Sequence, residues 1–494
     1  MPLPSVLGSE IEYGITVVND RDFDPISSCV LLVNAYHDTD DADILWDYDQ
    51  ENPLADARGF NVEGEKYTPN QQENIARNKT LKNGARFYVD HAHPEYSTPE
   101  VTNIYDLIAH EIAGERIMDA ARRSASSLLP EDQKILIYKN NSDRKGNSYG
   151  NHENYLVARR TPFRDIVTGL TPFLISRQIF CGAGKVGSEN RATPCHYQIS
   201  QRADFFETEV ALDTMVKRPI INTRDEPHAD RDKYRRLHVI LGDSNMSEVS
   251  MYMRTGTTSI VLALIEDGAL LRDVSLAEPV RVLKEISHDP DCKREYSLDA
   301  GGRMSAIQIQ EAYLEAAYRY FDSHEADPII KDVMARWERM LRLLAEDPMQ
   351  LHREVDWVAK RKLILEYMSR RGRAWDDPQI HMLDLQYHDV RRDKGLYHVL
   401  ERRGEMDRIV TDEDIERAIQ QPPEDTRAYF RGECIRRYGK AVFGVNWDSI
   451  SFNLGDDPIK RILMNEPLKG TRPHVEALLD ECPTAEELVR SLTS

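Results

Sequence analysis

Strand-like segments in which charged side chains alternate with apolar ones constrain the fold of this chain most strongly. Val6 to Val18 has the β-branched and aromatic content of a strand, interrupted at Gly14. Because side chains at i and i+2 of a strand point to the same face, Glu10 and Glu12 stand side by side, with Ile11 opposite. Two such carboxylates repel each other unless a cation binds them or one takes up a proton. Alone, the pair fits a solvated strand face as well as it fits a metal site.

A second segment, Ala85 to His91, favours the metal site. The same alternation places Arg86, Tyr88 and Asp90 on one face of the predicted strand. A cation, a phenol and a carboxylate in this arrangement suit a site for an anion together with a metal. Arg86 could form a forked contact with a phosphate, and Asp90 could act as a base or a nucleophile.

Further carboxylates and histidines follow this second strand. Glu95 and Glu100 add oxygen ligands, which are the ligands that magnesium prefers. His91 and His93 are expected to form hydrogen bonds instead, since magnesium sites are built from oxygen. The two strands together therefore predict a magnesium site.

Glu153 and His238 are further candidates, farther along the chain. Glu153 opens one predicted strand, and His238 lies inside another, on the same face as Arg236. A lone histidine in a strand is more often a hydrogen-bonded core residue than a ligand, so only its charged neighbours favour a functional role.

Composition limits the class of protein. The 494 residues suggest two or three domains, or one large α/β domain with a small appendage. A formal net charge of −20 argues against a general binder of nucleic acid or membrane surfaces. The N-terminus lacks the pattern of a signal peptide, no apolar stretch is long enough to span a bilayer, and the six cysteines are scattered without a C-x-x-C pair. We therefore expect a cytoplasmic protein with reduced thiols.

Periodicity and turn residues predict the order of elements. The polar, acidic segment 37–83 is expected to contain little regular structure. Strands are predicted at 154–159, 170–180 and 237–241, and helices at 103–129, 205–217, 247–268, 307–320 and 328–344. A small C-terminal domain is expected after about residue 423, with strand character over 441–452 and a helix over 473–492.

One segment matches a phosphate-binding motif but lacks the helix that the motif requires. Gly182 to Gly187 matches G-x-G-x-x-G after an apolar run, but the residues that follow are loop-like, whereas a dinucleotide-binding turn leads straight into a helix. A hairpin or a mobile loop is the better interpretation, and the sequence contains no Walker A motif.

Several long motifs, in order along nearly the whole chain, resemble those of the Pup ligase and Pup deamidase (depupylase) family. This family is related to glutamine synthetase and other carboxylate–amine ligases. The motifs are Gly8-x-Glu10-x-Glu12-Tyr13-Gly14, Asn83 to Asp90, His93-Pro94-Glu95-Tyr96, Asn222 to Asp230, Arg235 to His238 and Asn446-Trp447-Asp448.

The sequence is more similar to the deamidase branch than to the ligase branch. The segment 37–83 resembles a deamidase insertion, and the spacing from Asp90 to Glu95 is that of the deamidases, the ligases having one more residue. The resemblance implies an α+β fold, with a curved antiparallel sheet packed with helices. We accordingly expect a catalytic domain over 1–422, in which the insertion regulates access to the site, and a C-terminal domain over 423–494.

The resemblance also implies roles for single residues. By this likeness Glu10, Tyr88 and Glu95 are magnesium ligands, and Asp90 is the catalytic aspartate. Glu153 and His238 would contact the metal or the nucleotide, while Arg86, Thr98 and Trp447 would contact the nucleotide. The implied cofactors are Mg²⁺ and ATP, or ADP plus phosphate, with the nucleotide not consumed at each turnover.

The implied activity is hydrolysis of an amide. The C-terminal Gln of the modifier Pup would become Glu, and the isopeptide bond between that Glu and a lysine would be cut. The implied partners are Pup and pupylated proteins of the bacterial proteasome pathway, with neither nucleic acid nor membrane.

Three other functions stay open. The chain could be a Pup ligase, which forms the same bond and consumes ATP. It could be a carboxylate–amine ligase for small molecules, or a catalytically silent Pup-binding adaptor, which the intact acidic cluster disfavours.

Overall fold

The computed structural model describes residues 6–38, 43–64, 68–214, 216–455 and 458–493. At its centre lies a six-stranded sheet, in which every neighbouring pair is antiparallel. In spatial order its strands are β15 (Tyr234–Val239), β10 (Asn151–Ala158), β1 (Leu7–Glu12), β8 (His93–Ser97), β7 (Arg86–Asp90) and β6 (Asn78–Thr80).

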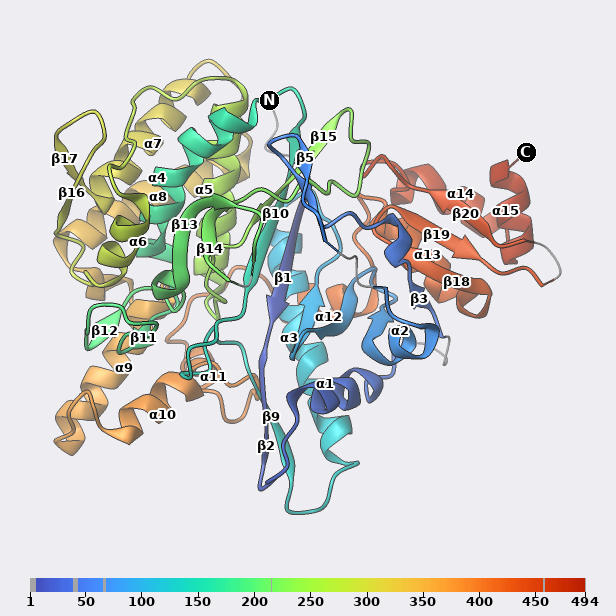
Figure 1. Cartoon of the computed structure of the whole chain (residues 1–494), viewed down its shortest axis with the longest axis horizontal. Coiled ribbons are helices and arrows are strands. Elements are labelled where there is room, and N and C mark those ends of the chain that lie inside the picture. Colours follow the sequence, from blue (N-terminus) through green and yellow to red (C-terminus); the bar gives the residue numbers. More distant parts are fainter. Residues whose placement is uncertain (1–5, 39–42, 65–67, 215, 456–457, 494) are drawn as a thin grey trace.

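A group of helices covers the β15 and β10 end of this sheet. Figure 1 shows the group to one side of β1 and β10. Its members are α4 (Phe163–Cys181), α5 (Glu248–Glu266), α6 (Pro279–Ser287), α7 (Ala306–Phe321) and α8 (Pro328–Glu346). Buried side chains such as Tyr155 of β10, Phe173 of α4 and Trp337 of α8 join strand and helices in one core.

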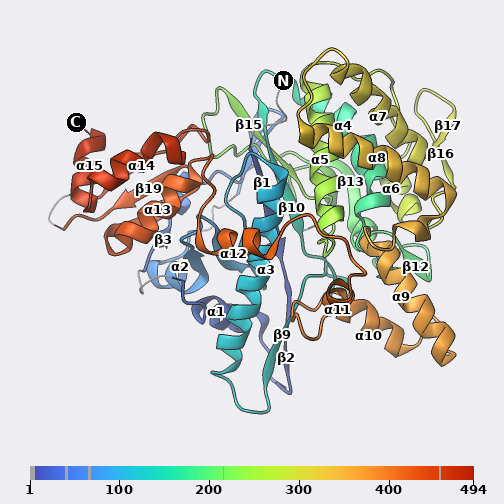
Figure 2. The ribbon, with the colours of Figure 1, turned by 180° about the vertical axis from the view of Figure 1, so that it is seen from behind.

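Helix α3 (Ile104–Ser126) packs beneath the other strands, on the same face of the sheet as these helices, as Figure 2 shows. This face is called the back face below. Ile11 of β1 and Phe87 of β7 are buried in one cluster with Ile117 of α3. The contact is close, since a Cβ on Gly114 would lie 2.3 Å from the ring of Tyr96. The back face of the sheet is therefore covered by helices and largely apolar, which leaves the other face open for a site of polar side chains.

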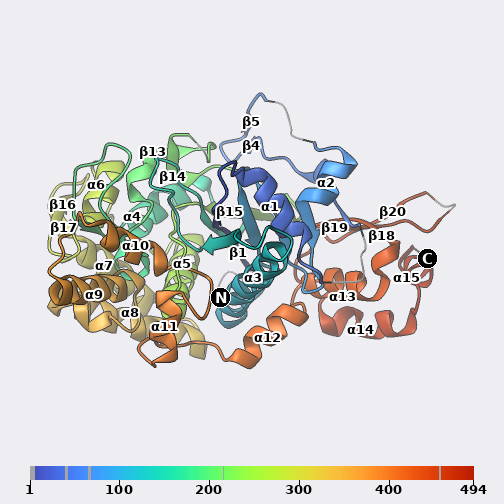
Figure 3. The ribbon, with the colours of Figure 1, turned by 90° about the horizontal axis from the view of Figure 1, so that it is seen from below.

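The C-terminal elements form a second, smaller unit on the opposite side of the sheet from α4–α8 (Figure 3). Strands β18 (Val442–Asn446), β19 (Ser449–Phe452) and β20 (Lys460–Leu463) form a sheet with β3 (Leu45–Trp46), which comes from the N-terminal half. Helices α13 (Ala428–Tyr438), α14 (Arg472–Glu481) and α15 (Ala485–Thr493) contribute to its separate hydrophobic cluster. The division into domains at residue 422 stays a prediction.

The remaining elements are short or peripheral. They are β2 (Gly14–Val18), α1 (Pro25–Asn34), η1 (Tyr48–Gln50), β4 (Ala55–Asp56), β5 (Phe60–Asn61), α2 (Gln71–Arg77), β9 (Lys134–Tyr138), β11 (Lys185–Val186), β12 (Tyr197–Gln198), η2 (Ala203–Phe205), β13 (Phe206–Ala211), β14 (Arg218–Asn222), β16 (Glu295–Ser297), β17 (Arg303–Ser305), η3 (Pro348–Leu351), α9 (Asp356–Arg371), α10 (Pro378–Gln386), α11 (Leu396–Arg402), α12 (Asp412–Gln420) and η4 (Gly439–Ala441).

Most sequence-based expectations match these elements. The α+β fold class is confirmed, and α3 begins as expected, with the Asn103 Oδ1 atom accepting a hydrogen bond of 2.9 Å from the Asp106 backbone N–H. Helix α5 ends shortly before Gly268, whose φ is 62°. The segment 182–187 leads into the two-stranded β11–β12 sheet and not into a helix.

Three expectations were wrong. The apolar run 170–180 is part of α4 and not a strand, because short apolar runs do not reveal their period once they are buried all round. In the run 205–217, strand β13 stands from Phe206 to Ala211, directly after η2, where a helix was expected; the alternation Phe206-Glu207-Thr208-Glu209-Val210 has a period of two. Within 37–83, α2 and β6 are regular, although residues 39–42 and 65–67 lie outside the described part.

No helix within the described ranges combines the length and the apolar character that crossing a membrane requires.

Candidate active site

The antiparallel register of the central sheet gathers polar side chains on its front face. Residues that face each other across antiparallel strands share a face, and so do residues i and i+2. The pairs Glu10–His152, Glu12–Glu95, Tyr88–Glu95 and Asn154–His238 connect five strands in this way. The front-face residues are Glu10, Glu12, Arg86, Tyr88, Asp90, Glu95, Ser97, His152, Asn154, Arg236 and His238.

The first cluster on this face consists of Glu12, Asp90 and Glu95, which can each offer an oxygen within 4.8 Å of the others. Burial, and then the charges of Asp90, Glu12 and Glu10, raise the pKa of Glu95 well above its usual value. Asp90 differs because, although burial opposes its charge, a contact of 2.9 Å with His91 Nδ1 holds its pKa below the usual value. A divalent cation would relieve the repulsion in this cluster.

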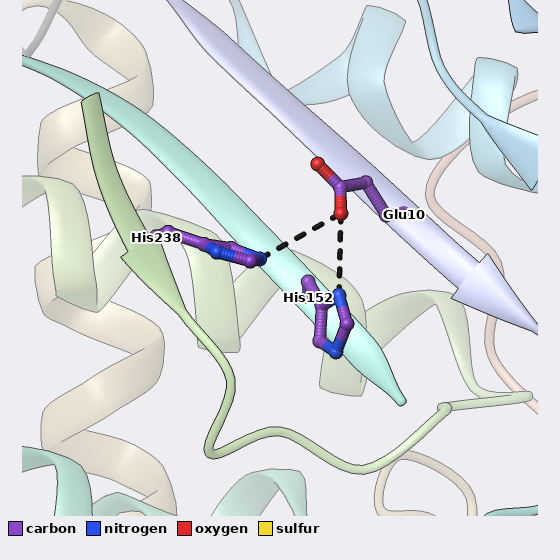
Figure 4. Close-up of side chains that lie close together, drawn as sticks. All are labelled: Glu10, His152 and His238. Atoms are coloured by element: carbon purple, nitrogen blue, oxygen red, sulfur yellow. Dashed lines mark hydrogen bonds and ion pairs between the residues drawn. The ribbon is translucent and has the colours of Figure 1, made fainter. Parts of the chain in front are cut away.

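The second cluster, which Figure 4 shows, consists of Glu10, His152 and His238 from three neighbouring strands. The Glu10 Oε2 atom lies 3.2 Å from His152 Nδ1 and 3.6 Å from His238 Nε2. Burial opposes the charge of Glu10, but the two histidines and Arg236 lower its pKa well below the usual value.

His238 is prepared to act as a ligand. Its side chain is 2% exposed, and neither ring nitrogen has a hydrogen-bond partner among the described residues. Burial lowers the pKa of His238 to about 3, so the ring is neutral at pH 7, as a metal ligand must be. The donors of the two clusters together fit one or more divalent cations, the oxygen-only cluster being the one suited to magnesium.

Tyr88 stands beside Glu95 across the β7–β8 pair. Burial, and then the charge of Glu95, raise the pKa of Tyr88 well above 10, so its phenol stays protonated at neutral pH. Any contact that Tyr88 makes with a cation is thus through a neutral oxygen.

Thr98 and Trp447 line a small cavity of about 80 Å³ at one end of this face. Glu10 also lines this cavity, so the cavity borders the second cluster. The ring of Trp447 packs edge-on against that of Trp46, which belongs to the segment 37–83, with 5.2 Å between the ring centres. The other lining residues include Gly8, Ser97, Asn154, His228 and Arg236.

Arg86 is held by side chains of the segment 37–83. Its guanidinium lies 4.0 Å from the ring centre of Trp46 and 3.8 Å from that of Tyr88. It also donates hydrogen bonds to the Asn78 side-chain oxygen and, over 3.0 Å, to the Tyr48 hydroxyl. Arg86 does not line the small cavity with Thr98 and Trp447 but is connected to Trp447 through Trp46.

Glu153 requires a correction, because it lies on the back face of the sheet. Its neighbour on β1 is Ser9 and not Glu10, and its carboxylate receives a hydrogen bond of 2.9 Å from Arg177 of α4. Arg254 of α5 lies 3.9 Å away. These buried arginines neutralise Glu153 on the helix side, so the structure contradicts a direct contact with a metal or nucleotide on the front face.

Sequence reasoning missed His152 and Asn154, which occupy the positions expected of Glu153. The side-chain amide of Asn154 donates a hydrogen bond of 2.9 Å to the Glu10 Oε1 atom. The alternation of the strand over 151–158 was visible in the sequence, but its orientation relative to β1 was not.

Asp90 and Glu12 open into a second, larger cavity of about 1070 Å³. Its other polar lining residues include His152, Ser148, Gln201, Arg202, Arg218 and His388. Glu10 thus borders the small cavity and Glu12 the large one, two residues apart on the same strand. The carboxylates therefore lie where two ligands would meet.

Comparison with known proteins shows which family and which relatives this chain resembles. Residues 5–451 match the family model described as Pup-ligase protein. The chain is 50% identical to a depupylase of Acidothermus cellulolyticus and 47% identical to a Pup deamidase/depupylase of Mycolicibacterium smegmatis, with 99% of both chains covered in each case. It is 43% identical to a Pup–protein ligase of Kineococcus radiotolerans, over 82% of this chain and 90% of the ligase.

Solved structures give the same family. The Pup ligase PafA in complex with Pup superposes with a TM-score of 0.81 and 34% identity, over 96% of this chain and 92% of that one. PafA in complex with ADP gives a TM-score of 0.75 and 36% identity, over 86% of this chain and 96% of that one.

Proposed function

The chain belongs to the Pup-ligase family, and we propose that it works as a deamidase and depupylase within that family. The proposed reactions are hydrolysis of the C-terminal Gln side chain of Pup to Glu and cleavage of the isopeptide bond between Pup and a lysine. This function places the protein in the cytoplasm, in the bacterial proteasome pathway. The higher identity and fuller coverage of the depupylase relatives support this branch over the ligase branch.

One observation carries the proposal: the carboxylates of the front face separate two cavities. The small cavity, with Thr98 and Trp447, has room for only part of a nucleotide as it stands, and we propose it as the place where the nucleotide binds because PafA is known in complex with ADP. The large cavity, which Asp90 and Glu12 line, suits the end of a protein substrate. A carboxylate between the two cavities can act on a bond presented from the large one.

Glu12 and Glu95 would hold Mg²⁺, as the repulsion that raises the pKa of Glu95 indicates, and Glu10 and the buried His238 offer further donors beside them. When bound, the metal supplies positive charge close to the amide carbonyl. Tyr88 would contact it through its neutral phenol.

Asp90 is the residue proposed to act on the amide. Its carboxylate is charged at neutral pH, lines the large cavity and has a side chain that is 36% exposed. It can attack the amide carbon or take a proton from the attacking water, and both routes add the elements of water across the C–N bond. The carbon keeps the hydroxyl oxygen, and the nitrogen leaves with the proton as ammonia or as the lysine amine.

The test is mass spectrometry of Pup before and after incubation with the protein, Mg²⁺ and ATP. Deamidation of a C-terminal Gln raises the mass of Pup by about one dalton. A second reaction, containing Pup that ends in Glu, a target protein and ATP, distinguishes the rival ligase activity. Conjugate formation without any deamidation would transfer the chain to the ligase branch.

A further inference from the structure

Two arginines in the wall of the large cavity lack an ion-paired carboxylate among the described residues. Arg202 and Arg218 line the cavity together with Asp90 and Glu12. No carboxylate forms an ion pair with either guanidinium within the described ranges, although Arg202 is only 2% exposed. Glu12 and Asp243 act on Arg202 electrostatically but, in the part of the chain that the structure describes, form no hydrogen bond with it. A buried charge without a hydrogen-bonded counter-ion is costly, so such a site favours an anion.

Ser148 brings the two guanidinium groups close together. The Nε atom of Arg202 donates a hydrogen bond of 3.3 Å to the Ser148 hydroxyl, and the Nη2 atom of Arg218 donates one of 2.6 Å to the Ser148 carbonyl. Arg202 also donates to the backbone carbonyls of Ile240 and Gly242. All these acceptors are neutral, so they fix the position of the guanidiniums without cancelling their charge.

One donor of the arginine pair has no protein partner in the described part of the chain. The buried Nε atom of Arg218 has no hydrogen-bond partner among the described residues. Burial, and then the like charge of Arg218, lower the pKa of Arg202. Because a guanidinium stays protonated in proteins, an anion held by both arginines would stabilise this part of the cavity.

The arginine pair is close to the carboxylate cluster along the chain. Gly150, two residues after Ser148, donates its backbone N–H to the Glu12 Oε2 atom. Glu12 also acts on both arginines electrostatically. An anion at the arginines would therefore lie near a bond placed at Asp90 and Glu12.

We propose that Arg202 and Arg218 bind the free α-carboxylate of the C-terminal residue whose side-chain amide is hydrolysed. This inference rests on the proposed function and names how its substrate is recognised. A C-terminal Gln and a C-terminal Glu linked to a lysine differ in the side chain but share a free α-carboxylate, so one arginine pair serves both reactions. An internal Gln or Glu has no α-carboxylate and is not processed.

The test compares two forms of full-length Pup, one ending in Gln as the free acid and the other ending in glutamine with an α-carboxamide. The wild-type protein is expected to deamidate the carboxamide form with a kcat/KM lower by about 30-fold, which is the loss of one charge-assisted pair of hydrogen bonds. In Arg218→Gln the kcat/KM for the free acid should fall similarly, and the two forms should become equivalent.

Matched variants show whether the charge is responsible. Arg218→Lys should keep part of the preference for the free acid, and Lys145→Gln, at an exposed position of the same cavity wall, should keep all of it. Melting temperatures establish that each variant folds, and binding of labelled Pup by anisotropy should show the same preference without turnover.

Two outcomes would overturn the inference: equal processing of both Pup forms by the wild-type protein, or an undiminished preference in folded Arg218→Gln. If the wild-type protein converted neither form, the proposed function itself would fail, which is a different result. If Arg218→Gln did not fold, the inference would still be tested by the ratio of kcat/KM for the two Pup forms in the wild-type protein and in Arg218→Lys.

Discussion

Asp90 combines two properties at the residue scale that its neighbours do not share. Its carboxylate is partly exposed to the large cavity, and the contact with His91 keeps its pKa low. Glu95 is buried among like charges, which raise its pKa. A group that stays charged and reachable suits attack or proton transfer, whereas a buried one suits metal binding.

We expect Asp90→Asn to lower the rate of Pup deamidation by at least about 100-fold, because the amide can neither attack nor accept a proton. Nucleotide binding should change little, since Asp90 does not line the small cavity. Deamidation is measured by mass spectrometry and nucleotide affinity by calorimetry. Turnover by this variant at the wild-type rate would remove Asp90 from the mechanism.

A variant of Glu153 tests whether this residue pairs with arginines on the back face of the sheet or binds a metal on the front face. Its buried ion pair with Arg177 predicts that Glu153→Gln destabilises the fold by about 3 kcal/mol, because a buried guanidinium loses its partner. Urea unfolding measures this, with Glu311→Gln on the exposed side of α7 as the control. A variant of unchanged stability that had lost metal affinity would instead support Glu153 as a ligand.

At the element scale, the segment 37–83 connects the central sheet with the C-terminal unit. Its strand β3 pairs in parallel with β18 of the C-terminal unit, and its strand β6 is the edge of the central sheet. Trp46 lies between, in contact with both Arg86 and Trp447. The segment is thus placed to influence the small cavity, and its role in regulating access stays a prediction.

Trp46→Ala should weaken nucleotide binding about 10-fold, because Arg86 and Trp447 lose the ring that positions them. Phe60→Ala is the matched control, since Phe60 belongs to the same segment but is 49% exposed. Fluorescent nucleotide titration compares the two. Equal affinities in both variants would separate this segment from nucleotide binding.

At the scale of the whole molecule, buried ion pairs join distant elements. His398 of α11 lies with its Nε2 atom 2.9 Å from Glu115 of α3 and its Nδ1 atom 3.5 Å from Glu401. Lys139 and Arg408 face the same glutamates. Although burial disfavours its charge, the two glutamates raise the pKa of His398 to about 9.

This raised pKa predicts a pH-dependent stability. An unfolded histidine has a pKa near 6.5, so His398 contributes its full stabilisation, up to about 3 kcal/mol, below about pH 6.5. The contribution is lost as the pH rises through about 9. The free energy of unfolding in urea at pH 6 and pH 9.5 should differ less in His398→Gln than in the wild-type protein. An identical difference in both would contradict this role.

The sequence predicted which side chains share a strand face at the candidate site better than it predicted the elements packed around the site. Alternation within one strand depends only on backbone geometry, so the common face of Glu10 and Glu12, and that of Arg86, Tyr88 and Asp90, could be predicted without a structure. The apolar run 170–180 could not be assigned in this way, since burial on all sides removes the periodic signal that separates a helix from a strand.

By itself, the sequence determined the family, the α+β class and the carboxylates of β1, β7 and β8, all of which are encoded in short segments. Only the tertiary structure decided that His152 and not Glu153 faces Glu10, because a shift of one residue in strand register reverses every side chain. It alone also brought Arg202 and Arg218 to Ser148, 54 and 70 residues away along the chain. Contacts across such distances depend on how elements pack together, which no local pattern records.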